Sequence, residues 1–204
     1  EPENINNELV AYIASLTAVQ SVSPEIASSI VKELRDQREY LKLIASENYS
    51  SLPVQLASGN LLTDKYSEGF PNHRFYAGCA NVDDVENFAA NAACKLFGAD
   101  HAYVQPHSGS DANMIASWAV INARVSIPEL KKLNITDPSD ASREEWNLVR
   151  KACGSQRLLG MNYYDGGHLT HGYRQNMSAQ IFDAYYYGVN QKTGLIDYDD
   201  LRKK

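Results

Sequence analysis

The sequence predicts an α/β fold with parallel strands, because short apolar segments alternate with stretches of helical periodicity along its 204 residues. Apolar residues recur at helical spacing through a charged stretch at 24–43, and again at 85–96. A short apolar segment at 158–162 leads into a loop rich in glycine and histidine. The hydrophobic content of 44% is that of an ordinary globular protein.

Two helices are expected near the N-terminus, over residues 3–18 and 24–43. The second begins at Ser23-Pro24, which has the form of an N-cap serine followed by proline in the first helical position. Residues 46–82 then lose periodicity and are rich in Ser, Asn, Pro, Gly and Tyr. A stretch of this length without regular structure is usually functional.

The middle of the chain predicts a helix over 85–96 that ends at Gly98, since glycine commonly terminates helices. Residues 101–105 have the short, partly apolar character of a strand, and a helix follows around 114–121. Residues 124–157 are polar and charged, and we expect them to form a surface insertion with some helix.

The C-terminal part predicts strands at 158–162 and 180–189, followed by a turn at 190–194. Residues 199–204 have the acidic first turn of a helix that is only beginning. Together with a first residue that is not methionine, this ending indicates a fragment of a longer protein.

Composition excludes several classes of partner. A net charge of −6 argues against a nucleic acid or an anionic membrane surface as the partner. No apolar run approaches the roughly 20 residues that cross a bilayer.

Cysteines that are widely spaced and lack CxxC pairs predict free thiols in a reducing compartment, which indicates the cytoplasm. These are Cys79, Cys94 and Cys153.

Ser108-Gly109-Ser110 lies between an expected strand and an expected helix. Glycine allows close approach of a ligand, the helix N-terminus supplies free N–H groups, and the two hydroxyls add donors. This combination suits a phosphate. The alternative is a serine N-cap after a tight turn. The segment is neither a Walker motif nor GxGxxG, so nucleotide binding is not favoured.

Residues 166–172 (Gly-Gly-His-Leu-Thr-His-Gly) have the composition of a ligand loop. The glycines indicate that something approaches the main chain closely, and the imidazoles offer ring faces and donors near neutral pH. A two-histidine metal site is disfavoured, because no cysteine or carboxylate cluster is adjacent. We expect His168 to stack on a planar ligand and His171 to make a structural hydrogen bond.

Tyr66-Ser67-Glu68-Gly69, with Arg74 and Tyr76 close behind, is a second candidate site. A glutamate flanked by tyrosines can act as a general acid or base if it is partly buried. A solvated loop with aromatic packing explains the same residues equally well.

In this order, the segments resemble the serine hydroxymethyltransferase family, and the long insertion is most similar to that of chlamydial-type members. The matching blocks are residues 43–49, 62–69, 74–76, 96–99, 104–110 and 166–172. The resemblance implies a transferase of fold type I that depends on pyridoxal phosphate (PLP). Such enzymes have an aspartate aminotransferase-like large domain of three α/β/α layers and an N-terminal helical arm.

The resemblance also implies a domain division, with the fold incomplete in this chain. Residues 1–80 would form the helical arm and a loop that contacts substrate and partner subunit. Residues 81–204 would form the first part of the PLP-binding large domain, with the insertion at about 124–157.

The implied reaction is the reversible conversion of serine and tetrahydrofolate, the co-substrate, into glycine and 5,10-methylenetetrahydrofolate. Ser108, Gly109 and Ser110 match the family's cup for the PLP phosphate, and His168 matches the imidazole that stacks on the pyridine ring. The folate contacts would come from Tyr163, Gly167, His168 and Leu169. No metal is implied.

Glu68 matches a catalytic carboxylate that handles protons near the substrate hydroxyl, and Tyr66 and Tyr76 match tyrosines of the substrate site. Ser46 matches a contact to the substrate carboxylate. In the family, Tyr66, Glu68 and Tyr76 reach into the partner subunit's site, so a homodimer with shared active sites is implied. His168 and Tyr66 join Glu68 as the expected catalytic residues.

Two residues depart from the family pattern: Asp165 stands where a histidine is common, and Tyr163 where an aliphatic residue is common. The family's Schiff-base lysine would lie beyond residue 204, and neither Lys65 nor Lys192 replaces it. The fragment alone is therefore expected to be inactive. Two other interpretations remain open: a related PLP aldolase acting on β-hydroxy amino acids, and a non-catalytic assembly protein.

Overall fold

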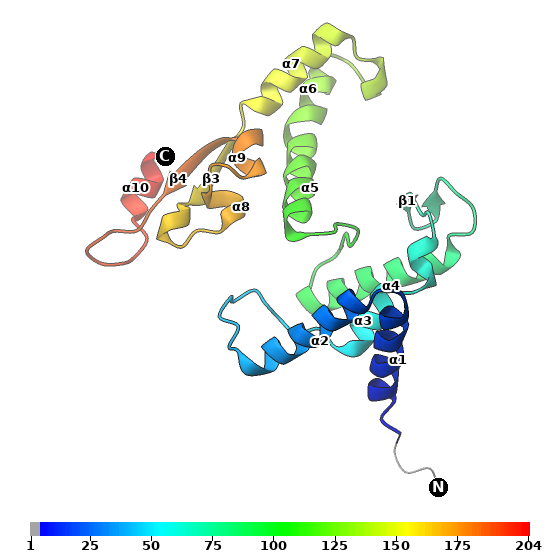
Figure 1. Cartoon of the computed structure of the whole chain (residues 1–204). Coiled ribbons are helices and arrows are strands. Elements are labelled where there is room, and N and C mark those ends of the chain that lie inside the picture. The colour runs from blue at the N-terminus through cyan, green and yellow to red at the C-terminus, as the bar shows by residue number, and fades with distance from the viewer. Residues whose placement is uncertain (1–4) are drawn as a thin grey trace. The chain divides into compact units, whose positions relative to one another are not determined.

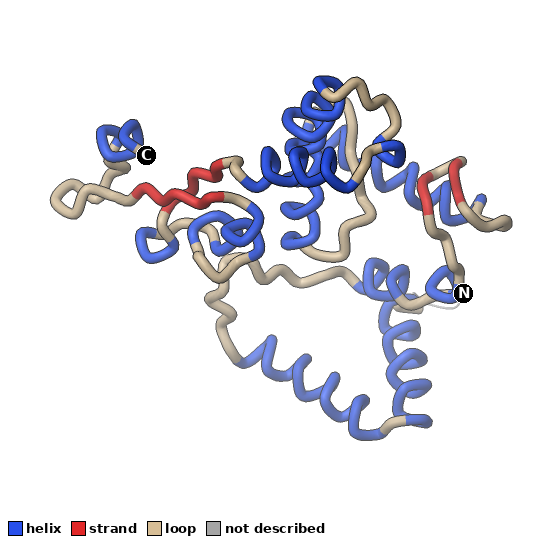
Figure 2. The backbone as a smooth tube through the Cα atoms, turned by 90° about the horizontal axis from the view of Figure 1, so that it is seen from above, coloured by secondary structure: helices blue, strands red, loops and turns tan. Residues whose placement is uncertain are grey.

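The computed structural model of the chain describes residues 5–204. It consists of two compact units, Glu1–Asn91 and Ala92–Lys204, whose boundary falls within helix α4 (Ala80–Phe97) (Figure 1). Helices make up most of the regular structure, and the strands are short (Figure 2). Among the described residues, none of the helices combines the length and apolar character needed to span a bilayer.

The first unit is helical apart from one small hairpin. Its elements before α4 are α1 (Asn7–Val22), α2 (Pro24–Glu39), α3 (Leu52–Ser58), a 3-10 turn (Leu61–Asp64), β1 (Gly69–Phe70) and β2 (His73–Arg74). The helices confirm the two N-terminal predictions, although residues 3 and 4 lie outside the described part. The boundary at Ser23-Pro24 is also confirmed, but the Ser23 side chain makes no capping hydrogen bond.

Both N-terminal helices end where their backbone leaves the helical region. The Ser23 N–H donates to the Val19 carbonyl at 2.8 Å and closes α1 further along the chain than predicted. Helix α2 ends at Glu39 rather than at residue 43, because Tyr40 is extended, with φ −117° and ψ 145°.

Strands β1 and β2 form an antiparallel hairpin in which Gly69 pairs with Arg74 and Phe70 with His73. Gly69 has φ +110°, and an added Cβ would overlap the His73 carbonyl oxygen, so the position requires glycine. Two-residue strands are too short for an alternating pattern, which is why the sequence did not reveal them.

Helix α4 ends as predicted at Gly98. This glycine has φ +62°, and the next N–H, of Ala99, donates to the Cys94 carbonyl at 3.0 Å. The hydrogen bond and the left-handed glycine together form a Schellman motif, which satisfies a carbonyl of the last turn.

The second unit contains a parallel pair of strands with helices on either side of them in sequence. Its elements are α5 (Gly109–Ile121), a π turn (Asn122–Ser126), α6 (Ile127–Lys132), a 3-10 turn (Pro138–Asp140), α7 (Arg143–Gly154), β3 (Arg157–Met161), a 3-10 turn (Tyr163–Asp165), α8 (Leu169–Gly172), α9 (Met177–Ile181), β4 (Asp183–Tyr187) and α10 (Tyr198–Lys203).

Strands β3 and β4 run parallel, from the pair Arg157–Asp183 to the pair Met161–Tyr187, which confirms the predicted parallel pairing. Strand β4 begins later than residue 180, because the Asn176 side chain caps α9. The predicted strand at 101–105 is wrong. In the described chain residues 101–105 belong to neither of the two sheets.

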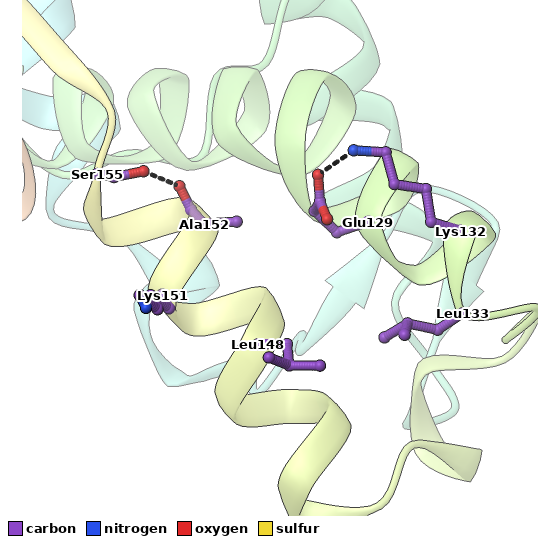
Figure 3. Close-up of a pocket in the computed structure, with 7 residues that line it drawn as sticks. All are labelled: Glu129, Lys132, Leu133, Leu148, Lys151, Ala152 and Ser155. Carbon is purple, nitrogen blue, oxygen red and sulfur yellow. Dashed lines mark hydrogen bonds and ion pairs between the residues drawn. The ribbon is translucent and has the colours of Figure 1, made fainter.

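Residues 124–157 contain helix, as expected, but they do not lie only at the surface. Helix α7 opens with a capping box in which Ser142 and Glu145 each bond the other's backbone N–H. Val149 on α7 and Leu130 on α6 are 1% and 4% exposed, so the segment contributes to the core of its unit. A pocket of about 390 Å³ lies between α6 and α7, with Leu148 and Lys151 in its lining (Figure 3). None of the predicted site residues lines it.

The glycine-rich loop packs tightly against the end of β3. A Cβ added at Gly167 or Gly172 would overlap the Met161 carbonyl oxygen, and Gly166 has φ +96°. The close approach that these glycines predicted is therefore made by the chain's own main chain.

Replacing Gly172 by alanine is expected to lower the free energy of unfolding by roughly 1–3 kcal/mol, since the buried backbone must shift to admit a methyl group. Gly154→Ala is the matched control, because a Cβ there would meet nothing within 4 Å. Urea unfolding of both variants measures the difference. Equal stabilities for the two variants would contradict this packing.

Candidate functional site

The residues predicted to act on a ligand fall into two groups, one in each unit. Tyr66, Glu68 and Tyr76, here called the hairpin group, flank β1 and β2 in the first unit. Ser108-Gly109-Ser110 and His168 lie in the second unit, at the N-termini of α5 and α8.

The hairpin group is in mutual contact. The rings of Tyr66 and Tyr76 meet edge to face, with centroids 5.2 Å apart. The Tyr76 hydroxyl donates to Oε2 of Glu68 at 3.3 Å. Both rings and the Glu68 side chain are exposed. In the described chain Glu68 is thus exposed and not partly buried, and the segment has the form of the solvated loop with aromatic packing that was the alternative for the sequence.

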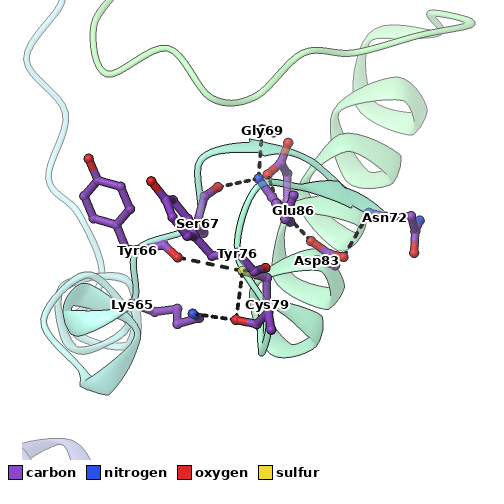
Figure 4. A network of polar contacts seen from close by, with 11 residues as sticks. Lys65, Tyr66, Ser67, Gly69, Asn72, Tyr76, Cys79, Asp83 and Glu86 are labelled. Atoms are coloured by element: carbon purple, nitrogen blue, oxygen red, sulfur yellow. Dashed lines mark hydrogen bonds and ion pairs between the residues drawn. The ribbon is translucent and has the colours of Figure 1, made fainter.

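Arg74 fixes the hairpin to helix α4 through two carboxylates of that helix. These belong to Asp83 and Glu86, which Figure 4 labels. The Arg74 side chain is 5% exposed, with Nε 2.8 Å from Oδ1 of Asp83 and Nη2 2.6 Å from Oε2 of Glu86. Its Nη1 donates to the carbonyls of Ser67 and Gly69 at 2.8 and 3.0 Å. The sequence pointed to Arg74 but not to its partners, although Asp83 and Glu86 have the i, i+3 spacing that places two carboxylates on one helix face.

Asp83 also accepts a hydrogen bond from the Asn72 backbone N–H, at 2.9 Å to Oδ2. That N–H and the Arg74 guanidinium hold the pKa of Asp83 below its ordinary value of 3.8. Glu86 and Asp83 in turn raise the pKa of Arg74. The carboxylate form of Asp83 is thus the one that the folded hairpin favours.

Two side chains join the ends of the hairpin segment. Nζ of Lys65 donates to the Ala77 carbonyl at 2.9 Å. Cys79 is 5% exposed, and its Sγ lies 3.2 Å from the Tyr76 carbonyl oxygen and 3.7 Å from that of Tyr66. The Lys65 ammonium is therefore already engaged by the backbone.

Ser46 lies in an exposed turn in which the Glu47 N–H donates to the Ile44 carbonyl at 3.0 Å. Within residues 5–204, no hydrogen bond joins its side chain to the hairpin group. In this unit Ser46 is therefore not part of the hydrogen bonds and ring contacts that join Tyr66, Glu68 and Tyr76.

Ser108 is the N-cap of α5, since its Oγ accepts a hydrogen bond from the Asp111 N–H at 3.1 Å. This confirms the serine N-cap and leaves the hydroxyl proton available to a ligand. The N–H groups of Gly109 and Ser110 belong to the first turn and have no acceptor within the helix. A Cβ at Gly109 would meet nothing within 4 Å, so the space beside the N-terminus is open.

A cavity of about 40 Å³ lies between α5, α8 and α9. Ser110, Thr170 and Asn176 are among the residues that line it. It has room for ordered water and is too small for a cofactor. The Ser178 hydroxyl donates to the carbonyl of Thr170, and both residues are buried. These contacts hold the His168 segment close to the N-terminus of α5.

His168 is the N-cap of α8, and its Nδ1 accepts a hydrogen bond from the Thr170 N–H at 3.1 Å. The ring is exposed, and the bond at Nδ1 places its proton on Nε2 in the neutral form. The His171 ring lies 6.0 Å away and makes no hydrogen bond within the described chain, so the expected structural bond of His171 is wrong. No cluster of three or more His, Cys, Asp or Glu side chains suited to a metal occurs among residues 5–204.

The remaining loop residues are partly accessible. Tyr163 contacts the rings of Tyr164 and Tyr173 edge to face, both at 5.4 Å, and is 39% exposed. Leu169 is 48% exposed. Asp165, which departs from the family pattern, lies against Gly188, where a Cβ would come within 2.6 Å of Oδ2.

Comparison with known protein families gives one match along most of the chain. The sequence model described as serine hydroxymethyltransferase matches residues 19–137 and 145–204. The interruption covers only 138–144, so most of the expected insertion is included in the match.

Curated relatives named serine hydroxymethyltransferase come from several bacteria. The protein of Treponema pallidum (strain Nichols) is 56% identical over 197 residues, which are 97% of this chain and 34% of the relative. That of Mycolicibacterium smegmatis is 53% identical, over 93% of this chain and 39% of the relative. That of Chlamydia trachomatis serovar D is 46% identical, over 95% and 39%. The chain thus spans about a third to two fifths of these relatives' length.

The stability of the hairpin is expected to depend on the ionisation of Asp83. Because the folded pKa lies below the ordinary value of 3.8, the stabilisation is fully present above that value and is lost as the pH falls through the folded pKa. Asp83→Asn should therefore destabilise the protein at pH 7, and the destabilisation should shrink as the pH is lowered through the acidic range below 3.8. Urea unfolding over this pH range, with the exposed Asp100→Asn as control, measures this; a loss independent of pH would refute it.

Proposed function

The chain belongs to the serine hydroxymethyltransferase family, and from this membership we propose that the full-length protein is a PLP-dependent serine hydroxymethyltransferase. The reaction is the reversible conversion of serine and tetrahydrofolate into glycine and 5,10-methylenetetrahydrofolate. The observation that carries the proposal is the match of nearly the whole chain, at 56% identity, to a relative of that name. The expected fold is the three-layer PLP transferase fold, of which β3 and β4 would be part.

The N-terminus of α5 has the donors that a PLP phosphate requires. The N–H groups of Gly109 and Ser110, the hydroxyls of Ser108 and Ser110 and the positive end of the helix all favour a dianion there. Glycine at the first helical position leaves the approach open. The residues therefore fit the group, and PLP would supply an electron sink for the substrate's α-carbon.

His168 is suited to hold one face of the pyridine ring. The Thr170 N–H fixes the orientation of the imidazole through Nδ1, and the ring remains exposed. A side chain whose rotamer is already fixed loses little entropy when a planar ring stacks on it. We place the folate contacts beside it, at Gly167, Leu169 and the exposed edge of Tyr163.

The hairpin group acts on the substrate in this proposal. Glu68 takes up or returns the proton of the serine hydroxyl, while the Tyr76 hydroxyl holds Oε2 of that carboxylate. Tyr66 packs against Tyr76 and limits its rotation. Ser46 contacts the substrate carboxylate.

The same proposal assigns the larger organisation of the protein. Residues 1–80 form the arm and contact loop, and 81–204 begin the PLP-binding domain with the insertion at about 124–157. Two copies associate so that the hairpin group of one completes the site of the other. The free state of Cys79, Cys94 and Cys153 fits a cytoplasmic enzyme.

Dependence on tetrahydrofolate separates this function from that of an aldolase. Glycine formation from serine by the full-length protein should require added tetrahydrofolate, and cleavage at the same rate without it would favour the aldolase.

In the same assay Glu68→Gln should lower kcat by about 10²–10⁴-fold, the usual contribution of a general acid or base. PLP absorbance and affinity should not change. Exposed Glu144→Gln is the control, and loss of PLP binding in Glu68→Gln would contradict the role of Glu68.

The 204-residue chain is expected to form no specific PLP adduct that survives borohydride reduction. Lys65 is engaged by the Ala77 carbonyl and Lys192 is exposed, whereas a reactive lysine must be desolvated. Absorbance before and after reduction, followed by peptide mass mapping, checks this. A stoichiometric adduct on Lys65 or Lys192 would overturn the assignment of the site.

A further inference from the structure

We infer that Arg74 is a positioning residue of the active site. It fixes the position of the Glu68 carboxylate by hydrogen bonds to the peptide groups before and after Glu68. The inference rests on the proposed function, because it concerns how the hairpin group is held. In this inference Arg74 does not touch the substrate and acts on it through Glu68.

The hydrogen bonds of Arg74 bracket Glu68 in sequence. Nη1 donates to the carbonyl before Glu68, that of Ser67, and to the carbonyl after it, that of Gly69. The carbonyl of Glu68 itself accepts from the Phe75 N–H at 3.0 Å. Three consecutive peptide groups around the proposed catalytic carboxylate are thus held by Arg74 and the residue that follows it.

The other side of the guanidinium is anchored to a helix. Nε and Nη2 bond Asp83 and Glu86 on α4, whose side chains are only 14% and 15% exposed. The guanidinium therefore transmits the position of a rigid helix to the backbone at residue 68. Tyr76, two residues after Arg74, donates to the same carboxylate and is placed by the same anchor.

Lysine cannot reproduce this arrangement. The guanidinium presents donors in a planar fork, and here they reach two carboxylates and two carbonyls. An ammonium keeps the charge, so it satisfies the acidic pair in part, but it has three donors on a flexible stem. Arg74→Lys should therefore preserve the fold while loosening the peptide groups around Glu68.

The test is a double-mutant cycle in the full-length protein, with wild type, Arg74→Lys, Glu68→Gln and the double variant. Folate-dependent glycine formation from serine is measured in each, together with the PLP absorbance spectrum. Arg74→Lys is expected to lower kcat on the order of 10²-fold, the effect of a misplacement of about 1 Å. In the Glu68→Gln background the same change should lower kcat less than about 3-fold, because the group that it positions is gone.

Arg202→Lys is the matched control, since that side chain is 73% exposed and pairs with Asp199 in the last helix. It should leave kcat and KM unchanged. If Arg74→Lys does not fold, Glu86→Gln is used in the same cycle, because glutamine keeps an acceptor for Nη2 without the charge. For Glu86→Gln, as for Arg74→Lys, an effect on kcat that adds to that of Glu68→Gln would refute the inference.

Additive effects of Arg74→Lys and Glu68→Gln in an active wild-type background would refute the inference and leave the proposed function standing. So would an Arg74→Lys variant with normal kcat. Wild-type protein that makes glycine from serine without needing folate would refute the proposed function first, and the inference with it. A merely structural arginine would lower the yield of folded protein but not the kcat of each folded site.

Discussion

The first unit depends on one buried cation. A guanidinium whose side chain is 5% exposed must be paired, because an unpaired charge away from water is strongly unfavourable. Arg74 meets this requirement only when residues 67–69 and the start of α4 lie on opposite sides of it. Strands of two residues have little stability of their own. The pairing of this charge therefore determines where the exposed carboxylate of Glu68 stands.

The second unit has a comparable constraint that involves no charge. The glycines of the loop allow its main chain to lie directly on the end of β3, at Met161, and the buried hydroxyl of Ser178 then fixes the carbonyl of Thr170. His168 caps α8 as a result and has its imidazole oriented from Nδ1. In both units, residues available to a ligand are held by groups that are themselves buried. This division of labour is typical of preorganised sites.

Local signals in the sequence predicted local structure well. Pro24 marked the start of α2 and Gly98 the end of α4, because caps act within a few residues. The strand expected at 101–105 was wrong, since pairing depends on another segment that sequence periodicity cannot supply. Motif blocks located the candidate site residues. The ion pairs of Arg74 with Asp83 and Glu86 join segments about ten residues apart, and only the three-dimensional structure revealed them. The exposed ring of His171 likewise depends on tertiary packing.

The claim that the Arg74-anchored hairpin serves a PLP site is tested most directly by a crystal structure of the full-length protein with PLP and serine. The account predicts that a Glu68 carboxylate oxygen lies within about 3 Å of the serine hydroxyl, in one subunit's own site or its partner's. It also predicts the PLP phosphate at the N-terminus of α5 and an Arg74 side chain still bonded to Ser67 and Gly69. A serine separated from every Glu68 and Tyr76 by bulk solvent would contradict the account.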